Sequence, residues 1–107
     1  MFLRTMIVVG ALFASASSYA VDASKAKLIV GKSDCMTCHA VNNKIVGPGF
    51  NEVAAKYKGD KGAVDSLAKK IKSGGSGVWG AIPMPAHPNL SDADVKLLAQ
   101  WILEGAK

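Results

Sequence analysis

The chain has 107 residues, with 13 Lys and Arg against 8 Asp and Glu, which gives a formal net charge of +5. This length allows one small domain. A composition that is 20% charged and 50% hydrophobic excludes a disordered tail, which would be less apolar, and a bundle of membrane helices, which would be less polar.

Residues 1–20 have the composition of a cleaved secretory signal. Arg4 supplies a positive charge, residues 6–14 form an apolar run, and Ser18-Tyr19-Ala20 places small residues where a signal peptidase cuts. A membrane anchor is the alternative, but a spanning helix needs about 20 apolar residues and this run is much shorter. We therefore predict a signal peptide over residues 1–20, a domain over residues 21–107, export to the periplasm, and no stable membrane insertion after cleavage.

The predicted mature domain has 12 lysines against 8 acidic residues and a charge of +4, because the only arginine, Arg4, lies in the signal. Without arginine it has no bidentate clamp for phosphate or guanine, so nucleic-acid binding is not expected. A lysine-rich surface is typical either of docking to acidic proteins or of simple solvation, and charge alone does not separate the two.

The first predicted helix covers residues 23–31, behind Asp22 as a candidate N-cap, because its apolar residues recur at helical spacing. Residues 40–49 contain two adjacent Asn and a Gly-Pro-Gly, which predict a loop. Two amphipathic helices follow, over residues 50–57 and 64–71, where apolar residues stand at i, i+3, i+4 and i+7.

The long segment from Ser73 to Leu90 contains four glycines and three prolines, which exclude a helix or a central strand. Long ordered loops in compact domains are usually functional. The last predicted helix begins behind Ser91, with Asp94 at the capping-box position, and ends before Gly105. No segment alternates like a strand, so we predict an all-α fold of four short helices.

The pentapeptide Cys35-Met36-Thr37-Cys38-His39 carries the clearest chemical signal. C-x-x-C-H is the attachment sequence of a c-type haem, and positions i, i+3 and i+4 share one face of a helical turn. A cofactor would also help a domain this small to build a sufficient core. The alternatives are a thioredoxin-like pair, a structural zinc site and an inert local disulfide, of which the first needs a βαβ context and the second needs four ligands.

Met84 is the candidate for the second axial ligand of such a haem. Of the four methionines, two lie in the predicted signal and Met36 lies between the two cysteines. Met84 stands between Pro83 and Pro85, whose fixed φ angles favour an extended backbone. His87 competes for this role, although a position beside an iron ligand or on the surface is favoured for it. An open iron, as in a haem enzyme or a gas sensor, is the alternative of a different class.

These residues together resemble the small bacterial class I cytochromes c, and in particular the short branch that donates electrons to periplasmic nitrite reductase. The resemblance covers residues 23–104 and is carried by the haem motif and four further segments: Val46-Gly47-Pro48, Ala54-Ala55-Lys56-Tyr57, the run from Lys70 to Gly80, and Ile82-Pro83-Met84-Pro85. It implies a class I cytochrome c fold wrapped around one haem.

The resemblance also implies roles for individual residues. Cys35 and Cys38 would form thioethers, and His39 and Met84 would be the axial ligands. The Pro48 carbonyl would accept the other His39 ring proton, while Trp79 would hydrogen-bond a haem propionate. Two departures stand out: Lys70 occurs where relatives often place an arginine near that propionate, and His87 occurs where they carry Asn or Gln.

The sequence therefore predicts a soluble, monomeric periplasmic electron carrier rather than an enzyme. Its acceptor would be a respiratory protein such as nitrite reductase, a peroxidase or a terminal oxidase. We expect partners to dock transiently at a haem edge bordered by lysines, for which Lys32, Lys44 and Lys72 are the candidates.

Overall fold

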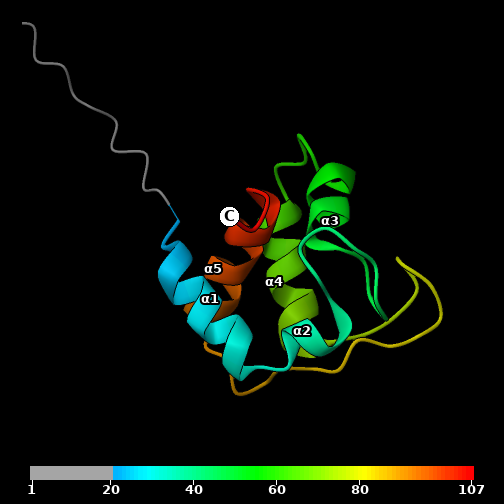
Figure 1. Cartoon of the computed structure of the whole chain (residues 1–107), viewed down its shortest axis with the longest axis horizontal. Coiled ribbons are helices and arrows are strands. Elements are labelled where there is room, and N and C mark those ends of the chain that lie inside the picture. Colours follow the sequence, from blue (N-terminus) through cyan, green and yellow to red (C-terminus); the bar gives the residue numbers. More distant parts are fainter. Residues whose placement is uncertain (1–20) are drawn as a thin grey trace, which may run out of the picture.

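A computed structural model describes residues 21–107, so the predicted signal peptide lies outside the described residues. Five helices form the described part of the chain, and Figure 1 shows their arrangement. In chain order they are α1 (Ala23–Lys32), α2 (Cys35–Cys38), α3 (Phe50–Lys56), α4 (Ala63–Ser73) and α5 (Asp92–Leu103). The only β pairing within residues 21–107 is two isolated bridges. The all-α prediction is confirmed, and the single-turn helix α2 is added to the four predicted helices.

Side-chain caps begin the first and last helices where the sequence predicts them. The Asp22 carboxylate accepts a hydrogen bond from the amide of Lys25 at 3.0 Å, and the Ser91 hydroxyl accepts one from the amide of Asp94 at 3.1 Å. Each bond satisfies an amide that has no partner inside its own helix, which is worth about 1 kcal/mol.

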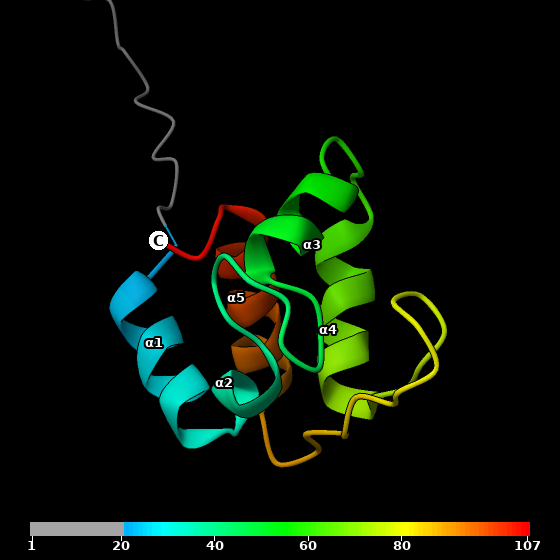
Figure 2. The same ribbon diagram turned by 45° about the vertical axis from the view of Figure 1, so that its right-hand side comes forward.

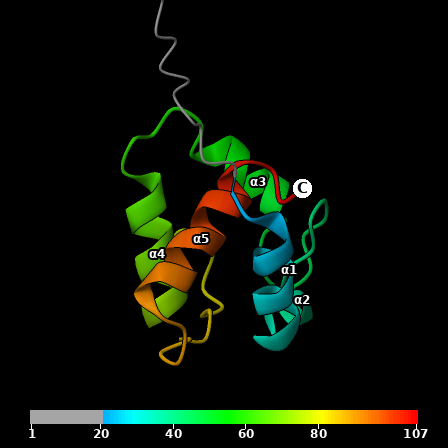
Figure 3. The same cartoon turned by 90° about the vertical axis from the view of Figure 1, so that its left-hand side faces the viewer.

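Helix α5 is the centre of the fold. It packs against α1, α3 and α4, and in Figure 3 it runs between α4 and α1. Its apolar face is wide because Leu98 and Ala99 are fully buried beside Trp101. The core that forms around it draws on four helices and the chain segment after α5, through Ala26, Val30, Phe50, Val53, Ile71, Val95, Leu98, Trp101, Ile102 and Ala106.

The two long loops leave the helical core on the side that carries α2. Residues 39–49 pass in front of the helices between α2 and α3 in Figure 2. Residues 74–90 return from α4 to α5, and their first part projects beyond α4 (Figure 1). Both loops therefore lie next to the cysteine-containing helix. Across residues 21–107, every helix is too short or too polar to cross a membrane.

Candidate haem site

Helix α2 presents the two thiols. It begins directly after Asp34, whose φ of 60° turns the chain sharply out of α1. Cys35 and Cys38 lie three residues apart on this single turn, and both are half-buried free thiols. His39 ends the turn with an extended backbone, at φ −122° and ψ 152°, although its amide still bonds the carbonyl of Cys35 at 2.9 Å. His39 is therefore the C-cap of α2, and the chain leaves the helical path at this residue.

The environment of Cys35 keeps its sulfur protonated. Burial raises the pKa of the Cys35 thiol, a local backbone hydrogen bond lowers it, and the neighbouring Asp34 carboxylate raises it again. The net effect is a raised pKa for this thiol. The cysteine is therefore held as a neutral thiol rather than as a reactive thiolate.

The His39 ring is fixed on two sides. Its Nδ1 donates a hydrogen bond to the Pro48 carbonyl at 2.7 Å, as the resemblance implies, which leaves the Nε2 lone pair free to bind a metal. The ring also stacks on Phe50, with centroids 5.3 Å apart and planes 24° apart, and Phe50 in turn meets Trp101 edge-on at 5.7 Å. The core of the domain thus supports the imidazole directly.

Gly47 allows the close approach of the loop to this ring. A Cβ on Gly47 would lie 2.5 Å from Cε1 of His39, which is closer than carbon atoms can pack. The amides of Val46 and Gly47 both donate to the carbonyl of Cys38, at 3.1 and 2.7 Å. This loop is therefore tied to α2 while Pro48 reaches the imidazole.

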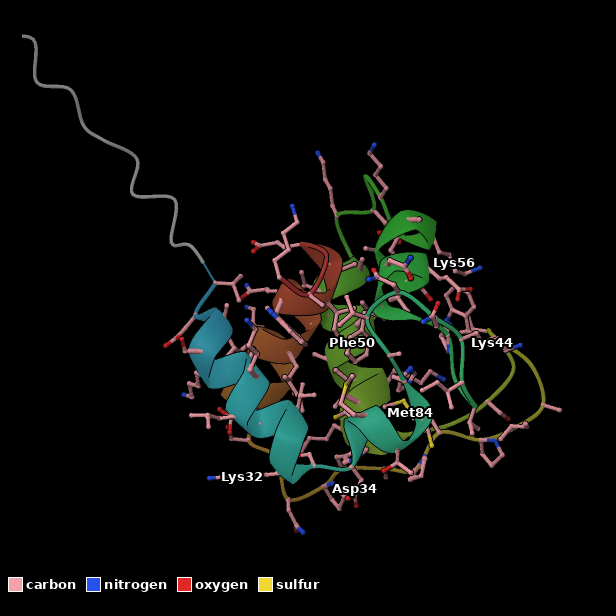
Figure 4. All side chains as sticks on the ribbon, viewed as in Figure 1. Lys32, Asp34, Lys44, Phe50, Lys56 and Met84 are labelled. Atoms are coloured by element: carbon pink, nitrogen blue, oxygen red, sulfur yellow. The ribbon has the colours of Figure 1, made fainter. Side chains whose placement is uncertain are left out.

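Met84 is held by main-chain pairing with Gly75. The Met84 amide donates to the Gly75 carbonyl at 2.8 Å, and the Gly75 amide donates to the Met84 carbonyl at 3.0 Å. Gly74 precedes this pair with a φ of +69°, and a Cβ there would collide with the Met84 carbonyl oxygen. The Met84 side chain is half-buried and packs against the core, and Figure 4 shows it beside α2.

The His87 ring makes a hydrogen bond to the protein backbone. Nε2 donates to the carbonyl of Ser33 at 2.9 Å, across 54 residues of sequence, while Nδ1 is buried without a protein partner. This bond joins the loop of Met84 to the residues that lead into Cys35. The geometry therefore favours Met84 over His87 as the distal group.

Lys56 and Lys70 have different surroundings in the structure. Lys56 places its Nζ 5.2 Å from the centroid of the Trp79 ring, which is cation–π distance. Lys70, which the resemblance places near a haem propionate, is half-buried and has its Nζ beside Gly75, 3.0 Å from where a Cβ would stand. The structure thus pairs Trp79 with Lys56 and places Lys70 at the base of the Met84 loop.

The residues around α2 and the two loops suit a flat apolar group. Their large hydrophobic side chains are exposed to solvent rather than packed in the core, namely Met36, Ile45, Val46, Val78, Trp79 and Ile82. Such a concentration of exposed apolar side chains marks a binding surface. Two free thiols, a free imidazole nitrogen and a half-buried thioether lie in the same part of the molecule, so the donor set fits a covalently attached haem.

Sequence patterns do not single out four residues that organise this site. The sequence predicts Gly47 only as part of a loop and Phe50 only as the first residue of a helix, and it predicts no contact of either with His39. Ser33 acts through its carbonyl, and its side chain gives no signal. Lys56 belongs to a segment that carries the resemblance, but nothing in that segment connects it with Trp79, and only the fold brings the two together.

The lysines proposed as docking residues differ in their surroundings. Lys44 is exposed and pairs with His39 through a β-bridge, and Lys32 is exposed at the end of α1. Lys72 forms an ion pair with Asp92 at 2.8 Å and so has a partner within the protein. Figure 4 places Lys44 and Lys56 on the side of the projecting loop and Lys32 on the other side.

The comparisons with known proteins all point to the same family. The family profile described as cytochrome c matches residues 23–106. Cytochrome c-551 of Azotobacter vinelandii is 58% identical over 69 residues, which cover 64% of this chain and 83% of that protein. Cytochrome c-552 of Nitrosomonas europaea is 56% identical over 72 residues, which cover 67% of this chain and 70% of that protein.

Solved structures agree with these sequence matches. The crystal structure of wild-type Nitrosomonas europaea cytochrome c552 superposes with a TM-score of 0.71 and 51% identity, covering 74% of this chain and 98% of that one. The class 1 cytochrome MtoD of Sideroxydans lithotrophicus superposes with a TM-score of 0.72 at 28% identity, covering 82% of this chain and 100% of that one.

Proposed function

Because this chain belongs to the cytochrome c family, we propose that it is an exported carrier of single electrons whose haem iron is bound by His39 and Met84. Family membership confirms the predicted class of electron-transfer protein rather than enzyme. It also confirms one c-type haem attached through Cys35 and Cys38, so the thioredoxin-like, zinc and disulfide interpretations of the pentapeptide are wrong.

The bond between His39 and Pro48 is the observation that carries the proposed ligation. With Nδ1 donating to the Pro48 carbonyl at 2.7 Å, the free lone pair of the imidazole is on Nε2, the atom that an iron requires. The Gly75 pairing and the His87 bond to Ser33 hold the Met84 loop against the segment that leads into Cys35. The two proposed ligands therefore belong to elements that are tied to the same short helix.

A bound haem supplies an iron that alternates between Fe(III) and Fe(II). The residues around it decide which state is favoured. Apolar side chains from α2 and the two loops would cover the haem and keep water from it, and this would penalise the additional positive charge of the oxidised form. A thioether from Met84 acts in the same direction, because soft sulfur stabilises Fe(II) better than a second imidazole does.

Partners would dock at the apolar side chains near the projecting loop. Ile45, Val46 and Trp79 are exposed; Lys44 precedes Ile45 in the chain, and the Lys56 ammonium lies over the Trp79 ring. Figure 4 shows Lys44 and Lys56 on the same side of the molecule. An apolar centre with positive flanks is complementary to a redox protein whose own electron-entry site is bordered by carboxylates. Nitrite reductase, a peroxidase and a terminal oxidase are the candidate acceptors.

The acceptor can be identified by stopped-flow oxidation of the reduced holoprotein. Each candidate enzyme is mixed with the reduced holoprotein at several ionic strengths. We expect the physiological acceptor to react fastest, with a rate constant that falls steeply as the salt concentration rises. Lys44→Gln should lower this rate at low salt, whereas Lys27→Gln, on α1, should leave it unchanged. A rate that does not depend on salt contradicts the docking proposal.

The ligation proposal has an independent test in the absorption spectrum. The oxidised holoprotein should show the weak band of a sulfur–iron bond at the red end of the spectrum, and the reduced protein should bind carbon monoxide poorly. Tight carbon monoxide binding without that band would instead indicate the alternative with an open iron, a haem enzyme or gas sensor.

Export and the monomeric state are tested on the purified protein. Removal of residues 1–20 predicts a mature chain that begins at Val21, and the mass of the periplasmic protein measures this directly. Sedimentation equilibrium should give the mass of one 87-residue chain with one haem. A full-length mass or a membrane-bound protein contradicts the proposed export.

A further inference from the structure

The loop that carries Met84 is anchored differently before and after the methionine. Before it, Gly75 and Met84 exchange two main-chain hydrogen bonds at 3.0 and 2.8 Å. After it, the next cross-connections come from His87. The amide of His87 is shared between the carbonyls of Ile71 and Lys72, both at 3.1 Å, which ties the loop to the end of α4.

The side chain of His87 makes a second connection, to a different part of the fold. Its Nε2 lies 2.9 Å from the carbonyl oxygen of Ser33. Ser33 caps the end of α1 and stands two residues before Cys35. A single residue thus joins the Met84 loop, the end of α4 and the segment that enters α2.

Hydrogen-bond chemistry defines which form of the imidazole makes this link. A carbonyl oxygen only accepts, so Nε2 must carry the proton. Nδ1 is buried and has no protein partner in the described chain, so the ring has one bond that holds it and no second one that could replace it. The orientation of the ring therefore depends on the Ser33 carbonyl.

We infer that His87 is a positioning residue whose Nε2–H bond to Ser33 holds the Met84 loop closed against α2 and so limits how often the Met84 sulfur leaves the iron. The inference rests on the proposed ligation by Met84. It concerns how long the ligand stays bound, whereas the proposed function concerns which ligand is bound.

Cyanide binding to the oxidised holoprotein measures this opening. Cyanide can bind iron only after Met84 has left, so its limiting rate at high cyanide concentration reports how fast the loop opens. Loss of one hydrogen bond in His87→Phe should raise that rate about five- to tenfold. His87→Gln, which keeps a donor of similar reach, should restore most of the parent rate, and Asn89→Ala in the same loop should leave it unchanged. If His87→Phe accumulates poorly, His87→Ala removes the same donor.

Amide hydrogen exchange separates positioning from general stability. In the donor-free variant the amide of Met84, which bonds the Gly75 carbonyl, should exchange faster, while the amide of the buried residue Leu98 in α5 should not. Equal acceleration at both amides, or an unchanged cyanide rate, would overturn the inference. Absence of the sulfur–iron band in the parent protein would overturn the ligation proposal and the inference with it, so the two failures are distinguishable.

Discussion

Gly47 and His39 lie so close together that residue 47 has room for no side chain. A Cβ on Gly47 would stand 2.5 Å from Cε1 of the His39 ring and 2.9 Å from its Nδ1, the atom that bonds Pro48. The glycine is therefore required by the position of the imidazole rather than by its own backbone angles.

Substitution of Gly47 by alanine should displace the imidazole. We expect Gly47→Ala to lower the free energy of unfolding by about 1–3 kcal/mol, the usual cost of overpacking, and to weaken the sulfur–iron band as the ring shifts. Urea unfolding of the holoprotein measures the first effect. Gly31→Ala is the control, because nothing lies within 4 Å of a Cβ there and the residue is in α1, where alanine should stabilise by about 0.5–1 kcal/mol.

Removal of the thioether should open the iron and leave the haem attached. In Met84→Ala the pigment should stay with the protein through acidic solvent extraction, because Cys35 and Cys38 are untouched. The reduction potential should fall and carbon monoxide should bind the reduced form, as the soft axial ligand is gone. Voltammetry and absorption spectra record both effects, and an unchanged potential would remove Met84 from the site.

The contact between Lys56 and Trp79 should steady the projecting loop. A cation–π contact at an exposed site contributes about 0.5–1 kcal/mol, so Lys56→Gln should speed amide exchange at Gly77, whose amide bonds the Gly80 carbonyl, by about two- to fivefold. Lys58→Gln removes an equal charge just after the same helix and should have no such effect. Equal exchange in both variants would show that Trp79 is held by other contacts.

The ion pair between Lys72 and Asp92 should make a small, pH-dependent contribution to stability. The hydrogen bond from Lys72, and then its charge, lower the pKa of Asp92. A carboxylate with a lowered folded-state pKa stabilises the fold above its unfolded pKa of about 3.9, and the effect is lost as the pH falls through the folded value. Asp92→Asn should therefore be less stable than the parent at neutral pH and equal to it in strong acid.

The urea concentrations at which the parent and Asp92→Asn are half unfolded, measured from neutral to acidic pH, test this predicted pH dependence. Because Asp92 is fully exposed, the expected difference is small. Asp65→Asn is the matched control, since Asp65 is an exposed carboxylate in the first turn of α4 just as Asp92 is in α5. A stability difference between the parent and Asp92→Asn that grows toward low pH would contradict the stabilising role of the Lys72–Asp92 ion pair.

Periodicity and caps predict the long helices well because both are local properties of the chain. The helix predicted over residues 23–31 ends one residue later, and the helix predicted over residues 64–71 extends by one residue at its start and two at its end. The pentapeptide also predicts its cofactor, because the spacing of two thiols and an imidazole is itself the chemical requirement.

Contacts between distant segments could not be predicted in this way. The bond from His87 to Ser33 spans 54 residues, and nothing in the local pattern of either residue specifies it. Lys56 meets Trp79 across 23 residues of sequence, and no local pattern connects the two. The His39 ring is oriented by a hydrogen bond to the Pro48 carbonyl, nine residues away in the loop.

The central place of α5 has a consequence for how the chain matures. Helices α1, α3 and α4 share α5 as their packing partner, yet α5 follows all of them in the chain. Under the proposed export, Cys35 and Cys38 would be accessible for as long as α5 has not yet packed against the other helices. The haem would then be attached before the core forms, because both thiols are already half-buried in the completed fold.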